Sequence, residues 1–226
     1  MDEYTSPEYT GPEYTGPEFS RSALLTIDLQ RDFVAGIAGT AEVLPAVRRL
    51  THAFREAGRP IVHVVRLYLP DGSNADLCRR TLRGMVNPHS PGSQLAAGLL
   101  PGGLPGGTAE RELDPDLLLA GRAQEVGPGE HILYKPRWSA FYGTPLLEHL
   151  AERAVSTVVV AGCNYPNCPR STLVDATERD LRAVAVRDAL SGWTAGADRE
   201  LAGMGIACLD TSEVVAAVRS RAASRA

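Results

Sequence analysis

Short apolar segments alternate with segments of helical spacing along most of the chain, and this alternation limits the fold more than any other feature. The clearest apolar segments are residues 23–27, 61–67, 157–161 and 183–186, which lack the polar alternation of a half-exposed strand. Residues 41–57, by contrast, carry apolar side chains at helical spacing. The pattern predicts an α/β fold, a three-layer αβα sandwich with a mostly parallel central sheet and helices on both faces. Further strands are expected at residues 132–134 and 206–209, and further helices at residues 144–153, 168–180, 198–204 and 212–222.

The first twenty residues differ from the rest of the chain. They repeat the motif EYTGP, in which Pro and Gly interrupt both helices and strand ladders. We expect residues 1–20 to form a flexible low-complexity tail and residues 21–226 to form a single domain, a size that one hydrophobic core accommodates. Residues 85–129, rich in Gly and Pro, are expected to be a long excursion from that domain.

Composition excludes several classes of function. The chain has no run of about 18 apolar residues, which a membrane-spanning helix would need. The acidic N-terminal segment lacks the pattern of a signal peptide. A net charge of −4 gives no electrostatic footprint for nucleic acid. The four cysteines and five histidines show no metal-ligand spacing, and no phosphate-binding glycine motif occurs. We therefore expect a cytoplasmic protein with no nucleic-acid or membrane partner, and His63, inside a strand, is expected to be a hydrogen-bonded core residue.

Three chemically distinct residues follow predicted strands. Asp28 follows the first strand, Lys135 follows residues 132–134, and Cys168 opens a helix after the loop beyond residues 157–161. Lys135 is also the sole lysine among 23 basic residues. Because parallel strands present their carboxyl ends at one edge of the sheet, where α/β proteins bind ligands, we expect these side chains to meet there.

The three residue types together suit nucleophilic catalysis. A thiol at a helix N-terminus faces unpaired amides and the positive end of the helix dipole, which favour a thiolate. Asp28 would accept the thiol proton and deliver it to a leaving amine, while the Lys135 ammonium would keep the carboxylate charged. Alternatives stay open: Cys168 as a buried apolar residue, Asp28 as a turn cap, a thiol redox sensor that uses Cys163 and Cys168, or a non-catalytic interaction module.

Three segments carry a resemblance to a known family: ALLTIDLQRDF, YKPRWSAFYGTPLLEHL and VVVAGCNYPNCPRSTLVDATERDLRAVAVRDALSG. Together they resemble the isochorismatase-like cysteine hydrolases, which include nicotinamidase and N-carbamoylsarcosine amidohydrolase, and the similarity runs from residue 21 to about 210. The resemblance implies a triad of Asp28 as base, Lys135 as its partner and Cys168 as nucleophile. It also implies an oxyanion hole from the backbone amides of Asn164 and Cys168, with a cis peptide bond between Cys163 and Asn164.

The implied activity is hydrolysis of the C–N bond of a small amide through a Cys thioester, without a cofactor, in a homodimer or homotetramer. Residues 66–76 hold no histidine, so no metal site of the nicotinamidase type is expected. The loop NYPNCPR resembles that of streptothricin hydrolase relatives, which suggests a cyclic amide, or lactam, of a cationic antibiotic. The other substrates considered are an N-carbamoyl amino acid and a nicotinamide-like amide. The residues expected to bind substrate are Tyr68, Asp71 (with Asp76), Trp138, Tyr165 and Trp193.

Overall fold

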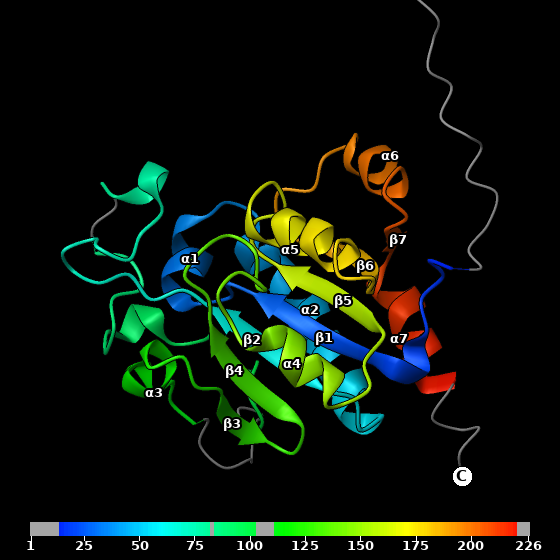
Figure 1. Cartoon of the computed structure of the whole chain (residues 1–226), viewed down its shortest axis with the longest axis horizontal. Helices are drawn as coiled ribbons and strands as arrows, with labels where there is room; N and C mark the ends of the chain where they lie inside the picture. The colour runs from blue at the N-terminus through cyan, green and yellow to red at the C-terminus, as the bar shows by residue number, and fades with distance from the viewer. Residues whose placement is uncertain (1–13, 82–83, 103–110, 221–226) are drawn as a thin grey trace, which may run out of the picture.

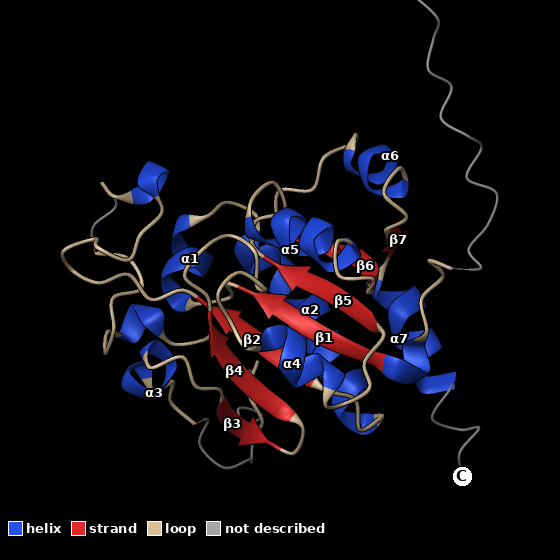
Figure 2. Ribbon diagram, viewed as in Figure 1, coloured by secondary structure: helices blue, strands red, loops and turns tan. Residues whose placement is uncertain are grey.

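A seven-stranded sheet forms the middle layer of the molecule in the computed structural model (Figures 1 and 2), which describes residues 14–81, 84–102 and 111–220. The strands are β1 (Ser22–Ile27), β2 (Ile61–Val65), β3 (Gln124–Gly127), β4 (Glu130–Tyr134), β5 (Thr157–Gly162), β6 (Arg182–Leu190) and β7 (Ala207–Leu209). Their order across the sheet is β3-β4-β2-β1-β5-β6-β7, and every neighbouring pair is parallel except β3 and β4. The predicted mostly parallel sheet is therefore confirmed.

Helices cover both faces of the sheet (Figure 1). They are α1 (Arg31–Gly36), α2 (Thr40–Glu56), α3 (Pro115–Leu119), α4 (Leu146–Ala151), α5 (Cys168–Thr177), α6 (Ala197–Ala202) and α7 (Thr211–Ser220). Leu25 and Ile27 of β1 pack in one apolar cluster with α4, α5 and α6, whereas Leu24 packs in another with α2 and α7. Since successive strand residues face opposite sides, this two-sided burial explains the continuous apolar runs in the sequence.

The excursion over residues 85–129 belongs to the domain. Its Leu95, Leu113 and Leu118 pack with Val65 and Ile132 in a third apolar cluster. This segment contains α3, whose start is capped by the Asp114 side chain, and the antiparallel edge strand β3. Neither element was expected, because β3 has four residues of mixed polarity and α3 is little more than one turn. The unexpected helix α1 is also short.

The described part of the N-terminal tail contacts the domain. Glu18 accepts a hydrogen bond of 2.6 Å from Ser156 Oγ and lies 3.5 Å from the Arg182 guanidinium. The earlier repeats, residues 1–13, lie outside the described residues, so the flexible tail stays a prediction there.

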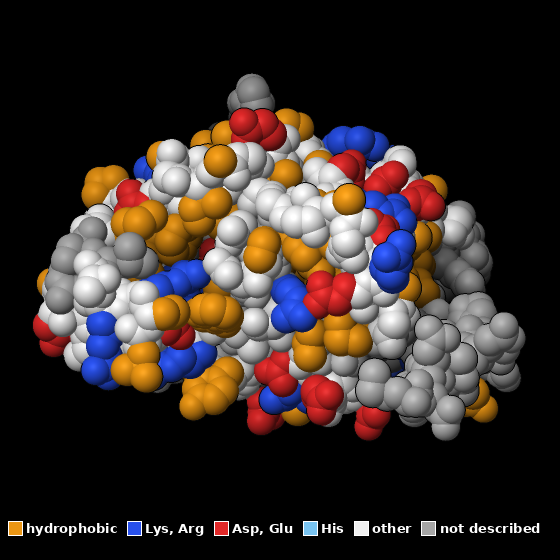
Figure 3. Space-filling view, turned by 90° about the horizontal axis from the view of Figure 1, so that it is seen from above, with side chains coloured by type: hydrophobic (Ala, Val, Ile, Leu, Met, Phe, Trp, Pro, Cys, Tyr) orange, Lys and Arg blue, Asp and Glu red, His pale blue; other side chains and the backbone are white. Residues whose placement is uncertain are grey.

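None of the helices in the described ranges is long and apolar enough to cross a membrane. Figure 3 shows basic, acidic and hydrophobic side chains interspersed over one face of the molecule.

Candidate active site

The central strand β1 places the candidate site at a switch point of the sheet. Its neighbours are β2 on one side and β5 on the other. The chain passes from β1 to α1 and α2, which pack in one apolar cluster, and from β5 to α5, which packs in the other. Register fixes which residues meet beyond the strand ends: Ile27 pairs with Gly162, and Val65 pairs with Tyr134. The next residues, Asp28 and Lys135, therefore emerge at the same edge, where ligands bind in folds of this type.

Asp28 and Lys135 form a buried ion pair. Lys135 Nζ lies 2.9 Å from Asp28 Oδ2, and the two residues are 0% and 3% exposed. Asp28 adopts a left-handed backbone conformation, with φ of +54°, that non-glycine residues rarely adopt and that is often found at functional sites. Its second oxygen, Oδ1, is buried and accepts no hydrogen bond from any described residue. The carboxylate thus has one satisfied oxygen and one oxygen available to a proton donor.

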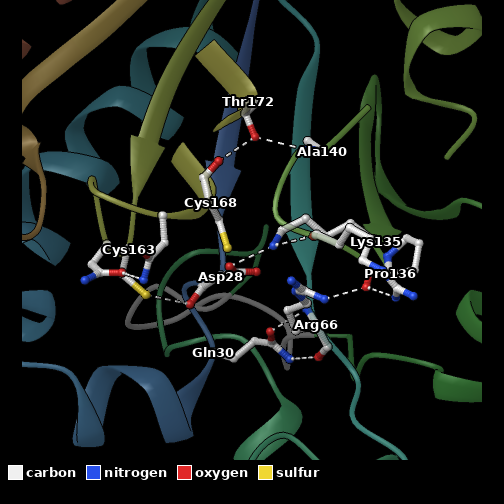
Figure 4. Close-up of polar contacts among 12 residues, drawn as sticks. Asp28, Gln30, Arg66, Lys135, Pro136, Ala140, Cys163, Cys168 and Thr172 are labelled. Carbon is white, nitrogen blue, oxygen red and sulfur yellow. Dashed lines mark hydrogen bonds and ion pairs between the residues drawn. The ribbon is translucent and has the colours of Figure 1, made fainter. Parts of the chain in front are cut away.

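The sulfur of Cys168 faces this pair (Figure 4). Cys168 is the first residue of α5, and the Thr172 hydroxyl fixes the start of the helix by donating to the Cys168 carbonyl at 2.8 Å. The same hydroxyl accepts the backbone N–H of Ala140 at 3.0 Å. Because Ala140 lies in the segment after Lys135, this hydroxyl couples the nucleophile's helix to the lysine's loop.

A close backbone approach at Gly162 shapes the turn before Cys168. Gly162 has φ of +127°, and a Cβ atom there would lie 2.2 Å from the Ile27 carbonyl oxygen. Any larger residue would therefore push β5 away from β1. Cys163 follows, donating its backbone N–H to Ile27 at 2.9 Å and its thiol to the Asp28 carbonyl oxygen at 3.2 Å.

The surroundings of Cys168 work against the thiolate that the sequence led us to expect. Burial raises the pKa of the Cys168 thiol, the Asp28 carboxylate raises it further, and the cations Lys135 and Arg66 offset only part of this effect. A thiol beside a carboxylate with an unpartnered oxygen is arranged for proton transfer at the moment of attack.

Two backbone amides beside the sulfur have no acceptor. Neither Asn164 N–H nor Cys168 N–H hydrogen bonds to another residue within the described part of the chain. Both residues line a cavity of about 10 Å³ together with Asp28 and Arg79. The amides match the expected positions of oxyanion donors. The expected cis peptide between Cys163 and Asn164 is wrong, because every described peptide bond is trans.

The expected substrate-binding residues divide into two groups. Tyr68 and Trp138 lie near the site, since both contact Arg79: its guanidinium donates to Tyr68 Oη at 3.1 Å and lies 5.7 Å from the Trp138 ring. Trp138 also lines an outer groove of about 620 Å³. Tyr165 and Trp193 instead pack against each other and extend toward α6, where their polar atoms reach Glu200 and Asp198.

The two expected aspartates are not available for a cation. Asp71 is exposed and accepts the backbone N–H of Ser73 in a surface turn. Asp76 lies 2.8 Å from the Arg66 guanidinium, which neutralises its charge. The segment also lacks the residues for a metal site of the nicotinamidase type, and no group of three or more His, Cys, Asp or Glu residues within the described ranges could hold a metal ion.

Two arginines at the site were not predicted. Arg66 directly follows β2, but the sequence pattern predicted a strand over residues 61–67 and so placed Arg66 inside it. Arg79 ends a short 3-10 turn, Leu77–Arg79, far from any strand end, and no sequence signal marks it. Its position depends on how the loop folds back over the sheet edge.

Comparison with known proteins agrees with the fold and the sequence motifs. The isochorismatase domain model matches residues 22–213. A protein of Arabidopsis thaliana named as a probable inactive nicotinamidase is 30% identical over 185 residues, covering 80% of this chain and 83% of that protein. The ureidoacrylate amidohydrolase RutB of Methylobacterium radiotolerans is 26% identical over 183 residues, 74% of this chain and 65% of the relative.

A solved structure extends this similarity to three dimensions. The isochorismatase family protein of Desulfovibrio vulgaris matches with a TM-score of 0.65 at 31% identity, covering 86% of this chain and 96% of that one. The family model alone spans most of the chain and includes Asp28, Lys135 and Cys168. The chain therefore belongs to the isochorismatase family.

Proposed function

We propose that this protein is a cysteine-dependent amidohydrolase, which cleaves the C–N bond of a small amide through a thioester on Cys168. The observation that carries the proposal is the unpartnered Asp28 Oδ1 beside the Cys168 thiol, on a carboxylate whose other oxygen is held by Lys135. Amidohydrolase activity in a family relative, RutB, supports the same reaction type.

The first half of the reaction forms the acyl-enzyme. Asp28 takes the thiol proton as the Cys168 sulfur attacks the amide carbon, and the oxyanion accepts hydrogen bonds from the Asn164 and Cys168 amides. The intermediate collapses with cleavage of the C–N bond, and the leaving nitrogen takes the proton back from Asp28. Lys135 Nζ donates to Asp28 Oδ2 at 2.9 Å and so holds the carboxylate in its orientation during the attack.

The second half of the reaction hydrolyses the thioester and regenerates the free enzyme. Water occupies the position of the departed amine, gives its proton to Asp28 and adds to the thioester carbonyl. The carbon–sulfur bond then breaks, and the proton on Asp28 passes to the sulfur. The products are a carboxylic acid and an amine or ammonia, and the thiol is restored. Atoms balance with one water consumed in each cycle.

The reaction is tested by release of ammonia or amine from a panel of amides. The panel includes a ureidoacrylate-type carbamoyl compound, an N-carbamoyl amino acid, nicotinamide and a streptothricin-type lactam. We expect the wild type to turn over at least one amide and the D28N variant to lose this activity by roughly 10²- to 10⁴-fold. D28N activity equal to wild type would refute the mechanism. A lactam substrate is supported by the loop motif alone, because Asp76, which was expected to bind the cationic substrate, is already paired with Arg66.

The redox-sensor alternative makes a different prediction. It requires Cys163 to act as a thiolate, but burial and the nearby Asp28 carboxylate raise its pKa well above the usual value. Peroxide treatment followed by non-reducing peptide mapping separates the two functions. A Cys163–Cys168 disulfide that forms reversibly at neutral pH, in a protein without amidase activity, would favour the sensor. The homodimer or homotetramer remains a prediction, which sedimentation analysis would test.

A further inference from the structure

Three cations surround the candidate site, and two of them have carboxylate partners. Lys135 pairs with Asp28, and Arg66 pairs with Asp76. The third, Arg79, has no carboxylate within 4.0 Å among the residues that the structure describes. Among the described residues it donates a hydrogen bond to the Tyr68 hydroxyl, a neutral group, because burial raises the pKa of Tyr68. The site therefore carries one guanidinium that forms no ion pair within the described ranges.

Arg79 connects the lining of the inner cavity with that of the outer groove. It lines the small cavity with Asp28 and Cys168, and its guanidinium carbon lies 5.7 Å from the centre of the Trp138 ring, which lines the larger groove. A cation–π contact at this distance does not consume the N–H groups of the guanidinium as hydrogen-bond donors. A group bound to these N–H donors would be near the nucleophile without displacing it.

The Trp138 ring that Arg79 contacts carries an N–H donor without an acceptor. Trp138 Nε1 is buried and has no hydrogen-bond partner among the described residues. A buried N–H without an acceptor is costly and uncommon in folded proteins. An N–H without an acceptor and a guanidinium without a carboxylate partner among the described residues therefore belong to neighbouring side chains near the cavity.

We propose that Arg79 binds a carboxylate of the substrate, with Trp138 Nε1 as a second donor, so that the substrate is a small amide that also carries a carboxylate. The inference rests on the proposed amidohydrolase function and specifies its substrate class. A planar carboxylate matches the fork of a guanidinium and accepts two parallel hydrogen bonds from it. The sequence, by contrast, suggested that Asp71 and Asp76 would bind a cationic substrate. In the structure Asp71 is exposed and Asp76 is paired with Arg66.

The volumes give Arg79 a second role in admitting substrate. The inner cavity, at about 10 Å³, holds little more than one water molecule. The outer groove, at about 620 Å³, is large enough for a small organic acid. An amide reaches Cys168 only if a lining side chain moves, and Arg79 is the long, partly exposed side chain in that lining. A carboxylate that draws Arg79 toward the groove would open the path to the sulfur.

Three amides of equal length test the charge preference: succinamate, butanamide and β-alaninamide, which end in a carboxylate, a methyl group and an ammonium. We expect wild-type kcat/KM to be highest for succinamate. R79M should lower that value roughly 10- to 100-fold and should remove most of the preference for succinamate over butanamide, whatever its effect on access to the cavity. R80M, a neighbouring exposed arginine outside the cavity lining, is the matched control and should retain the preference. W138F, which keeps a stacking ring without the N–H, should show a smaller loss, and R79K a partial one.

Binding of succinate, measured by calorimetry without turnover, separates failure of this inference from failure of the proposed function. One outcome is that wild type and R80M bind succinate, R79M does not, and none of the amides is hydrolysed. This outcome would support the carboxylate site and refute the proposed amidohydrolase function. Equal hydrolysis of succinamate and butanamide, or a succinamate preference that survives in R79M, would keep the amidohydrolase and overturn the role of Arg79. A preference for β-alaninamide would overturn it as well.

Discussion

Two buried charged networks lie on the same strands, and they differ in how completely they are satisfied. In one, Glu130 at the start of β4 accepts bonds from Arg55 at 2.6 and 2.7 Å and from His63 at 2.8 Å, and the other His63 nitrogen contacts Thr26 Oγ1 at 2.7 Å. In the other, Asp28 is bound by Lys135 through one oxygen and leaves the second without a donor.

The difference separates a structural network from a reactive one. A fully bonded buried carboxylate fixes the packing of its strands and has no free acceptor for a substrate or a thiol proton. An open oxygen in a buried carboxylate is unfavourable in the resting protein, and it persists at sites where a proton or ligand arrives during function. Both networks hold a buried carboxylate with a cationic partner, so the unsatisfied carboxylate oxygen is what distinguishes Asp28 from Glu130.

The largest expected effect comes from removing the nucleophile. C168A should lower amide hydrolysis by about 10⁴-fold or to background, because no other group of the site forms the thioester. Its free energy of unfolding should change by no more than about 1 kcal/mol, since the substitution removes one small side-chain atom from the core. Urea unfolding and ammonia release measure the two quantities on the same sample. C168A that retains turnover would contradict the account.

A substitution in the Glu130 network should lower stability and leave activity nearly unchanged. E130Q removes the charge that Arg55 and His63 share and should lower the free energy of unfolding by about 3 kcal/mol. Its activity at a temperature where it stays folded should be close to that of wild type, because Glu130 lies at the opposite end of β4 from Lys135. A large loss of kcat in folded E130Q would show that the two networks are coupled. E125Q on the neighbouring edge strand, at an exposed position, is the matched control.

The raised pKa of Cys168 predicts how its reactivity depends on pH. Burial and Asp28 hold the thiol protonated, so the rate of alkylation by iodoacetamide should still be rising at the ordinary thiol pKa of 9.0. K135M removes a cation that lowers this pKa and should slow alkylation further, by about tenfold or less at pH 8. Peptide mapping assigns the label to Cys168 rather than to the exposed Cys78. A rate that reaches its plateau below pH 7 would indicate a stable thiolate instead.

The smallest expected effect is the acid dependence of stability. Burial alone would raise the pKa of Glu130, but hydrogen bonds from Arg55 and His63 outweigh it, so the folded-state pKa lies below the ordinary value of 4.5. The stability from this network is therefore fully present above pH 4.5 and is lost as pH falls through the folded-state pKa. The difference in unfolding free energy between wild type and E130Q should shrink over that range. A difference that grows on acidification would contradict the assignment.

The sequence predicted the sheet and three of the four charged or nucleophilic residues at its edge, because both depend on local patterns. Apolar runs mark strands that are buried on both faces, and the residue after each run is placed by the sheet itself. Arg66 was missed because the apolar pattern predicted a strand through residue 67, whereas β2 ends at Val65. By contrast, Arg79 and Trp138 meet through a loop whose path depends on tertiary packing, and no spacing in the sequence encodes that contact.

The aromatic residues show the same limit. Tyr165 and Trp193 stand close to the site in sequence, yet their hydrogen bonds to α6 direct them toward the helical layer. Asp71 stands beside Tyr68 in sequence, yet a surface turn holds its carboxylate on a neighbouring backbone amide. Proximity along the chain predicted that these residues would be nearby, but not the direction of their side chains.

Partitioning of the acyl group between water and hydroxylamine tests the central claim most directly. If the Asp28–Lys135 pair activates Cys168 to form a thioester, wild-type protein supplied with a hydrolysable amide and hydroxylamine should release both the acid and the hydroxamate from one shared intermediate. C168S should release neither above background. Acid production by C168S at the wild-type rate would show that the reaction does not need the sulfur, and the account would then be wrong.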